Sequence, residues 1–181
     1  MRIISLKEFF QTGHFGPISI GQHKSELIEA FGEEFEFADC GETHIIRYGW
    51  YEFFYWTNSG KIFGIQNDHL QADTSDHAAC INFFNKDWIL DKWFLRDNRN
   101  ISLKEVEKVL RLENIAFNLE QLCIVGHESM ITNQRSLVSM DFQGSYRIME
   151  DDELGEFIKW NEYSENDYNN FVLNGIRIFK Y

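Results

Sequence analysis

The chain has 181 residues, of which 44% are hydrophobic and 16% aromatic, so it can bury a sizeable core and is not intrinsically disordered. Its 29 acidic and 17 basic side chains give a formal net charge of −12, which argues against nucleic acid or an anionic membrane as a direct partner. A basic protein would be attracted instead, although many soluble proteins without such a partner are also acidic.

Cysteine usage and the absence of long apolar runs point to a reducing, aqueous compartment. The three cysteines, Cys40, Cys80 and Cys123, include no Cys-x-x-Cys pair, which argues against a disulfide framework or a zinc site. Lys7 and Glu8 interrupt the N-terminal apolar residues, unlike a signal peptide. No apolar run approaches the roughly 18 residues of a membrane helix. We therefore expect a cytoplasmic protein.

Two short helices are predicted in the first part of the chain. Ser5 and Glu8 have the spacing of a capping box, which predicts a short helix that ends at Gly13. A second helix is predicted over 23–31, with an apolar face. It ends at Gly32, where helices commonly place a residue with a left-handed backbone.

An aromatic-rich strand unit follows the second helix. Residues 33–42 alternate phenylalanine with acids and predict either a short edge strand or an acidic loop. The run 45–56 is too rich in aromatic and β-branched residues for a surface helix, so we interpret it as a strand. The Asn-Ser-Gly sequence at 58–60 predicts a turn that returns the chain as a hairpin over 61–66.

The second part of the chain begins after a polar stretch at 69–77, which is the best candidate for a linker. Ser102 and Glu105 form a second capping box, which opens the clearest helix, 103–111. A further helix is predicted through 157–160. The other predicted strands are 81–84, 88–95, 122–125, 136–142 and 175–181.

Together these elements predict an α+β fold, an antiparallel sheet with a few short helices. An extended segment, a helix and a pair of strands follow Ile18 and again follow Ile101. This order suggests two similar helix-plus-hairpin halves, about 1–75 and 76–181, packed within a single domain of residues 1–181. Helix-then-hairpin is also a common unit in unrelated proteins, so duplication is a hypothesis.

Motifs that carry chemistry are absent from the sequence, including nucleotide-binding glycine loops, the serine nucleophile elbow and helical zinc motifs. His69 and His77 share a polar stretch with Asp68, Asp73 and Asp76, for which a solvated loop is a simpler interpretation than a metal site. The surroundings of Cys80 and Cys123 are apolar, and those of Cys40 are acidic, which disfavours a reactive thiolate. We predict no catalytic residue, metal or cofactor.

Candidate partner-binding residues are acids and aromatic side chains. The acids gather in 33–39 and in 150–153, and aromatic residues follow one another along the predicted strand at 50–56. Exposed Trp and Tyr side chains rimmed by acids are typical of a protein-binding surface, whereas core packing is the alternative for them. The predicted set is Glu33, Glu34, Glu36, Asp39, Tyr51, Tyr55, Trp56, Glu150, Asp151, Asp152 and Glu153.

The central unit carries a glycine-rich lead-in at 16–21, a helix that closes on Gly32, a strand that ends in Tyr-Gly at 48–49, and an aromatic-rich strand. This pattern resembles a loose set of small bacterial proteins, several of which look like immunity proteins of polymorphic or contact-dependent growth inhibition toxin systems. The resemblance covers about 55 of the 181 residues, and its motifs are structural. The chain departs from it at His23, where Ser or Thr is usual, and at Glu33, where Pro is frequent.

The resemblance implies a cytoplasmic, acidic, non-enzymatic protein that binds a partner. Our leading hypothesis is an immunity protein that neutralises a cognate toxin, expected to be a basic nuclease, through an acidic surface. One alternative is a small hydrolase or nucleotide-modifying enzyme whose acids and histidines converge only in the fold. The other alternative is a general protein-interaction module. The sequence leaves the oligomeric state and the identity of the toxin open.

Overall fold

The computed structural model describes residues 1–71, 77–83, 85, 87–96, 99–123, 128–144, 146–151, 155–160 and 168–180. The helices are α1 (Leu6–Thr12), α2 (Lys24–Phe31), α3 (His77–Ile81) and α4 (Leu103–Leu112), with short 3₁₀ turns η1 (Trp93–Arg96) and η2 (Tyr168–Asn170). The strands are β1 (Arg2–Ser5), β2 (Glu36–Cys40), β3 (Thr43–Tyr48), β4 (Tyr51–Trp56), β5 (Ile62–Asn67), β6 (Trp88–Asp91), β7 (Phe117–Cys123), β8 (Glu128–Asn133), β9 (Ser139–Gln143), β10 (Tyr146–Asp151), β11 (Gly155–Trp160) and β12 (Val172–Phe179).

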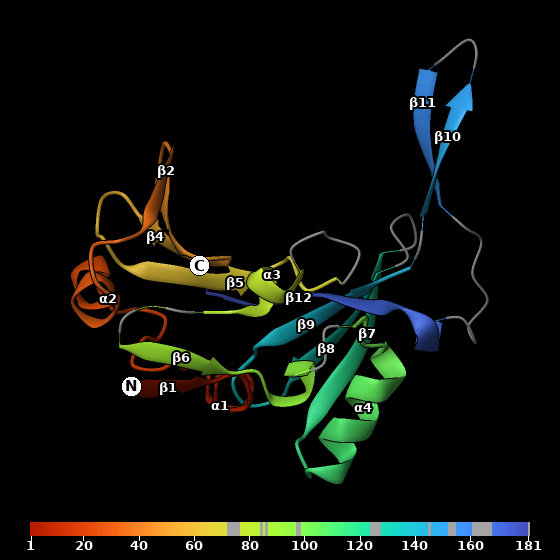
Figure 1. Ribbon diagram of the computed structural model, residues 1–181, viewed down its shortest axis with the longest axis horizontal. Helices are drawn as coiled ribbons and strands as arrows, with labels where there is room; N and C mark the ends of the chain where they lie inside the picture. The colour runs from red at the N-terminus through yellow and green to blue at the C-terminus, as the bar shows by residue number, and fades with distance from the viewer. Residues whose placement is uncertain are drawn as a thin grey trace.

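An antiparallel sheet of eight strands forms the body of the molecule, in the order β2-β3-β4-β5-β12-β9-β8-β7 (Figure 1). Strands β1 and β6 form a separate parallel pair, and β10 and β11 form a separate antiparallel hairpin that projects from the body. The predicted α+β fold, with an antiparallel sheet and a few short helices, is confirmed.

The two parts of the chain supply matching sets of elements. Helix α2 is followed by the four adjacent strands β2 to β5, and helix α4 is followed by β7, β8, β9 and, after the β10–β11 hairpin, β12. The two four-stranded groups meet where β5 pairs antiparallel with β12, with Ile65 opposite Ile178. The repeated unit is therefore larger than the predicted helix-plus-hairpin, and its origin by duplication stays a hypothesis.

The helices begin where the capping signals predict. Ser5 Oγ accepts a hydrogen bond from the first turn of α1 at 3.3 Å, and Ser102 and Glu105 cap α4 reciprocally. His23 takes the cap position of α2, where its Nδ1 accepts a backbone N–H and the Glu26 side chain accepts the His23 N–H at 3.0 Å. These backbone hydrogen bonds lower the pKa of both Glu26 and Glu105.

The aromatic-rich unit in the first part of the chain differs from the prediction in one respect. The run 45–56 is two strands, not one, because Gly49 has a φ of +61° and turns the chain between β3 and β4. The segment 33–42 contains β2, so its interpretation as an edge strand is correct. The hairpin at 58–60 is confirmed, since β4 and β5 pair antiparallel around it.

Three predictions in the second part are wrong. Residues 157–160 lie in β11, which pairs with β10 in register, so they are not helical. Residues 81–83 are not a strand, because helix α3 ends at Ile81, and Phe84 lies outside the described residues. The predicted strand 88–95 stops at Asp91, where the Asp91 Oδ1 accepts the Trp93 N–H and η1 begins. In each case a short apolar run fits more than one structure, and pairing with distant segments decides between them.

Alternation along β4 decides which side chains reach the core. Tyr51, Phe53 and Tyr55 are buried, whereas Glu52, Phe54 and Trp56 lie on the opposite face and are half-buried. The core holds rings from this strand together with apolar residues of β1, α1, α2 and α4. One face of the sheet therefore carries the core, and the other carries a mixture of aromatic and polar side chains.

Two buried tyrosines should make the protein sensitive to alkali. The Tyr51 hydroxyl donates to the Ile81 carbonyl at 3.0 Å, and Tyr48 donates to the Gly32 carbonyl. Burial raises the pKa of Tyr48 to about 12 and raises the pKa of Tyr51 as well. An unfolded tyrosine ionises near pH 10, so above about pH 10 the folded state holds more protons, and stability falls as pH rises.

We expect urea unfolding between about pH 9 and 11.5 to show this loss, with a shallower pH dependence in Tyr51→Phe, which removes one of the two shifted groups. At neutral pH the same variant should lose about 1 kcal/mol, the value of one buried hydrogen bond. An unchanged pH dependence in Tyr51→Phe would show that this tyrosine stays neutral in the unfolded chain or is free to ionise in the folded one.

Candidate protein-binding surface

Four of the predicted acids lie together at one edge of the large sheet. Glu33 and Glu34 connect α2 to β2, and Glu36 and Asp39 belong to β2 itself. All four are exposed, as are all five residues of β2 and Glu42 in the turn that follows. We call these five acids, Glu33, Glu34, Glu36, Asp39 and Glu42, the acidic edge.

The acids of the acidic edge differ in how far basic neighbours compensate them. Glu36 forms an ion pair with Arg47 of β3, and an Asp39 oxygen lies 3.2 Å from the His44 Nε2. The other ring nitrogen of His44 lies 3.3 Å from the Tyr55 hydroxyl. Glu33 and Glu34 form no ion pair within the part of the chain that the structure describes. Their charge therefore acts over distance, and we expect them to attract a basic partner most strongly.

A pocket lies at the start of the acidic edge, where α2 ends. It is lined by Glu29, Ala30, Phe31, Gly32, Glu33, Glu34, Tyr48, Gly49, Asn85 and Asp87. The carbonyls at the end of α2 are held in place, since Ala30 accepts from Trp88 Nε1 at 2.9 Å and Phe31 accepts from Asn85 Nδ2 at 3.1 Å. The helix C-terminus adds negative potential to that of the acids, so the charge of the pocket suits a lysine or arginine side chain.

The predicted aromatic anchors are only partly on this surface. Tyr51 and Tyr55 are 1% and 2% exposed, so neither can contact a partner in this structure, because both lie on the core side of β4. Trp56 is half-buried, stacks on Phe63 at 4.3 Å, and lines a hollow with Glu42 at the far end of the acidic edge.

Sequence reasoning missed Phe37, the residue of β2 between Glu36 and Asp39. Its side chain is 54% exposed and lies edge-on to His44, with ring centroids 5.0 Å apart. The alternation of Phe and acid in 33–42 was the signal that could have singled it out.

The second acidic segment lies on the projecting hairpin. Glu150 and Asp151 end β10, where they pair with Glu156 and Gly155 of β11, and Asp152 and Glu153 lie outside the described residues. Figure 1 shows that this hairpin and β2 project from the same side of the body, at opposite ends of it. The two predicted acidic segments thus face the same side without being contiguous.

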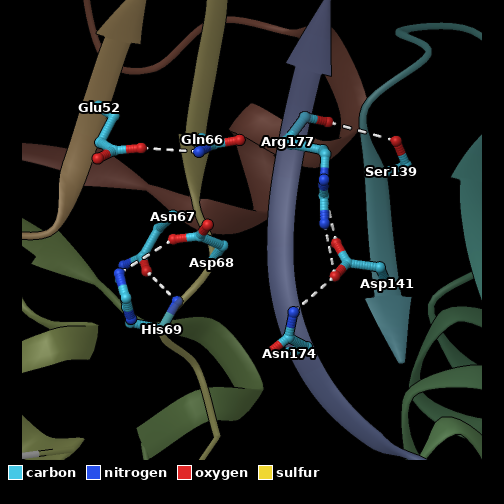
Figure 2. Close-up of polar contacts among 9 residues, drawn as sticks. All are labelled: Glu52, Gln66, Asn67, Asp68, His69, Ser139, Asp141, Asn174 and Arg177. Carbon is cyan, nitrogen blue, oxygen red and sulfur yellow. Dashed lines mark hydrogen bonds and ion pairs between the residues drawn. The ribbon is translucent and has the colours of Figure 1, made fainter. Parts of the chain in front are cut away.

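A polar network lies on the face of the sheet opposite the core (Figure 2). Arg177 of β12 donates to both carboxylate oxygens of Asp141 in β9, at 3.0 and 2.7 Å, and Asn174 donates to one of them at 3.0 Å. On the neighbouring strands Gln66 donates to Glu52 at 2.7 Å. Each of these groups has a partner within the sheet, so the network is suited to holding strands together.

The described residues offer little for catalysis or metal binding. They contain no group of three or more His, Cys, Asp or Glu side chains placed to hold a metal ion. Asp68 and His69 form a pair at 3.2 Å, but Asp73 and Asp76 and the side chain of His77 lie outside the described part. Cys80 is buried, as expected, Cys40 is exposed, and the side chain of Cys123 is among those not described.

Among the described helices none has both the length and the apolar character needed to cross a membrane. Comparisons of the chain with protein-family models, with curated proteins and with solved structures found no match. We therefore infer a function from the charge and geometry of the acidic edge.

Proposed function

We propose that this chain is an immunity protein that acts in the cytoplasm, where it binds a cognate toxin domain and neutralises it through the acidic edge. The observation that carries the proposal is the position of Glu33, Glu34, Glu36 and Asp39, all exposed along one edge strand of a protein of net charge −12. A toxic nuclease needs a basic surface to hold its phosphate substrate, and an acidic surface is complementary to it.

The two ends of the acidic edge would contribute in different ways. Glu33 and Glu34 line the pocket beside α2, which would receive a basic side chain of the toxin. Phe37 and Trp56 supply the apolar contact that an acidic surface alone lacks. Exposed charges chiefly set the rate of association, whereas a buried aromatic contact slows dissociation.

Reversing the charge of Glu33 and Glu34 tests the proposal. With a cognate toxin domain as the partner, Glu33→Lys/Glu34→Lys should slow association by about tenfold or more and weaken its salt dependence. The matched control is Glu8→Lys/Glu120→Lys, which changes net charge equally at exposed residues of α1 and β7. Its association rate should change by less than about threefold.

Equal effects in the two double variants would contradict a role for the acidic edge, since net charge alone would then explain the change. Binding that is indifferent to salt between about 50 and 500 mM would also contradict it, because screening of exposed charges rises steeply over that range. In cells, the Glu33→Lys/Glu34→Lys variant should protect against the co-expressed toxin less well than the control variant.

The alternatives from the sequence make different predictions. A small hydrolase or nucleotide-modifying enzyme needs converging acids and histidines, and the two histidine–aspartate pairs of the described residues, Asp39–His44 and Asp68–His69, each join groups that are close in sequence or on adjacent strands. A general interaction module would bind a partner that is not toxic. An immunity protein should protect cells that express its cognate toxin, whereas neither the enzyme nor the general interaction module should do so.

A further inference from the structure

We propose that β2 receives the toxin by strand addition: an extended, basic segment of the toxin pairs with the outer edge of β2 and becomes a ninth strand of the sheet. This inference rests on the proposed function and specifies how the partner is held. Three features of β2 support strand addition: its outward backbone groups, the lack of residues that block its edge, and its own side chains.

The backbone of β2 is prepared for a further strand. It pairs with β3 through five consecutive residues without a shift in register, and no described strand pairs with its other side. A two-residue turn joins the strands, with Gly41 at a φ of +79°. Such a turn makes Cys40 and Thr43 a hydrogen-bonded pair, so the alternation of an antiparallel ladder directs the N–H and C=O groups of Phe37 and Asp39 outward.

Proteins usually protect a free edge with lysine, proline, a bulge or a covering segment. The β2 sequence Glu-Phe-Ala-Asp-Cys has no lysine or proline, its register is regular, and all its residues are exposed. The opposite edge of the sheet differs, because β7 shifts register between Gln121 and Cys123, as a bulged edge does. The protection of β2 is therefore its negative charge.

The negative charge of β2 favours a basic strand over a second copy of this chain. A second copy of the chain would bring its own Glu36 and Asp39 against those of the first, and like charges across a strand pair are destabilising. A strand with lysine or arginine side chains would instead be attracted. We therefore assign the edge to a basic strand and not to self-association.

The side chains beside β2 also specify a pattern for the added strand. Phe37 and Asp39 point to the same side of the sheet, as alternate residues do. Phe37 is 54% exposed, so an apolar residue of the added strand would cover it. Two positions along, a lysine or arginine would meet Asp39. The expected partner strand thus carries an apolar and a basic residue at i and i+2 on this side.

Amide hydrogen exchange tests strand addition without the toxin. The probe is a synthetic peptide about seven residues long, to match a short strand, in which a lysine stands two positions after a central valine, so that both lie on one side. The control is the same peptide with its central valine replaced by proline, which removes the N–H and disfavours a strand. The lysine–valine peptide should raise the protection of the Phe37 and Asp39 amides by about tenfold or more, and the control peptide should not. The Leu119 amide of β7 should change with neither peptide.

Protection that is equal with the two peptides, or chemical-shift changes spread over all exposed acids, would overturn strand addition and indicate attraction by charge alone. A second test uses the toxin. Phe37→Pro removes the outward N–H and places a ring at the edge, whereas Phe37→Ala removes the side chain and keeps the N–H. Urea unfolding of both variants first verifies that each is folded.

We expect Phe37→Pro to abolish neutralisation of the toxin. Phe37→Ala should weaken it less, because it loses the apolar contact but keeps the outward N–H. If Phe37→Pro neutralises as well as Phe37→Ala while Glu33→Lys/Glu34→Lys fails, the proposed function stands and strand addition is wrong. If Glu33→Lys/Glu34→Lys also neutralises normally, the proposed function itself is wrong. The peptide exchange experiment decides between the modes of binding should Phe37→Pro prove unfolded.

Discussion

Replacing Arg177 with methionine should lower the free energy of unfolding by about 3 kcal/mol, whereas the same replacement at Arg47 should cost less than about 1 kcal/mol. Both arginines pair with a carboxylate across the large sheet, on the face opposite the core. The carboxylate differs: the side chain of Asp141 is 6% exposed, and that of Glu36 is 72% exposed. Loss of Arg177 leaves a buried charge whose remaining side-chain donor, among the described residues, is Asn174 (Figure 2).

The measurement is urea unfolding of Arg177→Met, Arg47→Met and the double variant Arg177→Met/Asp141→Asn. The double variant removes the uncompensated charge, so it should recover part of the stability that Arg177→Met loses. If the two single variants lost equal free energy of unfolding, Asp141 would be well enough hydrated without its arginine. Burial would then not determine how much this ion pair contributes to stability.

Local signals explain why much of the fold was predictable. The capping box of Ser102 and Glu105 involves residues three apart, and the structure contains both of its hydrogen bonds. The turn at 58–60 likewise depends on its own sequence. In 33–42 the alternating phenylalanines and acids predicted either an edge strand or an acidic loop, and the structure has the edge strand β2, with Glu33, Glu34, Glu36 and Asp39 exposed.

Distant contacts explain what the sequence did not reveal. Strand β8 is short and largely polar, and its pairing on both sides with β7 and β9 makes it a strand. Tyr51 and Tyr55 were candidate anchors because a strand can turn either set of alternate residues outward. The position of Gly49 fixes which set faces the core, and a shift of one residue would have exposed both tyrosines instead. The Asp141–Arg177 pair joins strands from distant parts of the sequence, so no local pattern marks it.

Replacing Phe15 with alanine should lower the free energy of unfolding by about 4 kcal/mol, more than the loss of Arg177 does. Phe15 lies in the segment between α1 and α2 and is completely buried. Its ring has centroid distances of 4.9 to 6.4 Å to the rings of Phe9, Phe31, Tyr51, Phe53 and Phe83. These rings come from two helices, from β4 and from the segment after α3, so one side chain joins four parts of the core.

The matched control is Phe37→Ala, which removes the same side chain from the exposed edge strand β2, where 54% of it is in solvent. That change should cost less than about 1 kcal/mol, because little apolar surface returns to water. Urea unfolding of both variants at neutral pH provides the measurement. A loss in Phe15→Ala no larger than that in Phe37→Ala would mean that the surrounding rings close over the vacated space, since the cost of such a cavity depends on how far its walls can collapse.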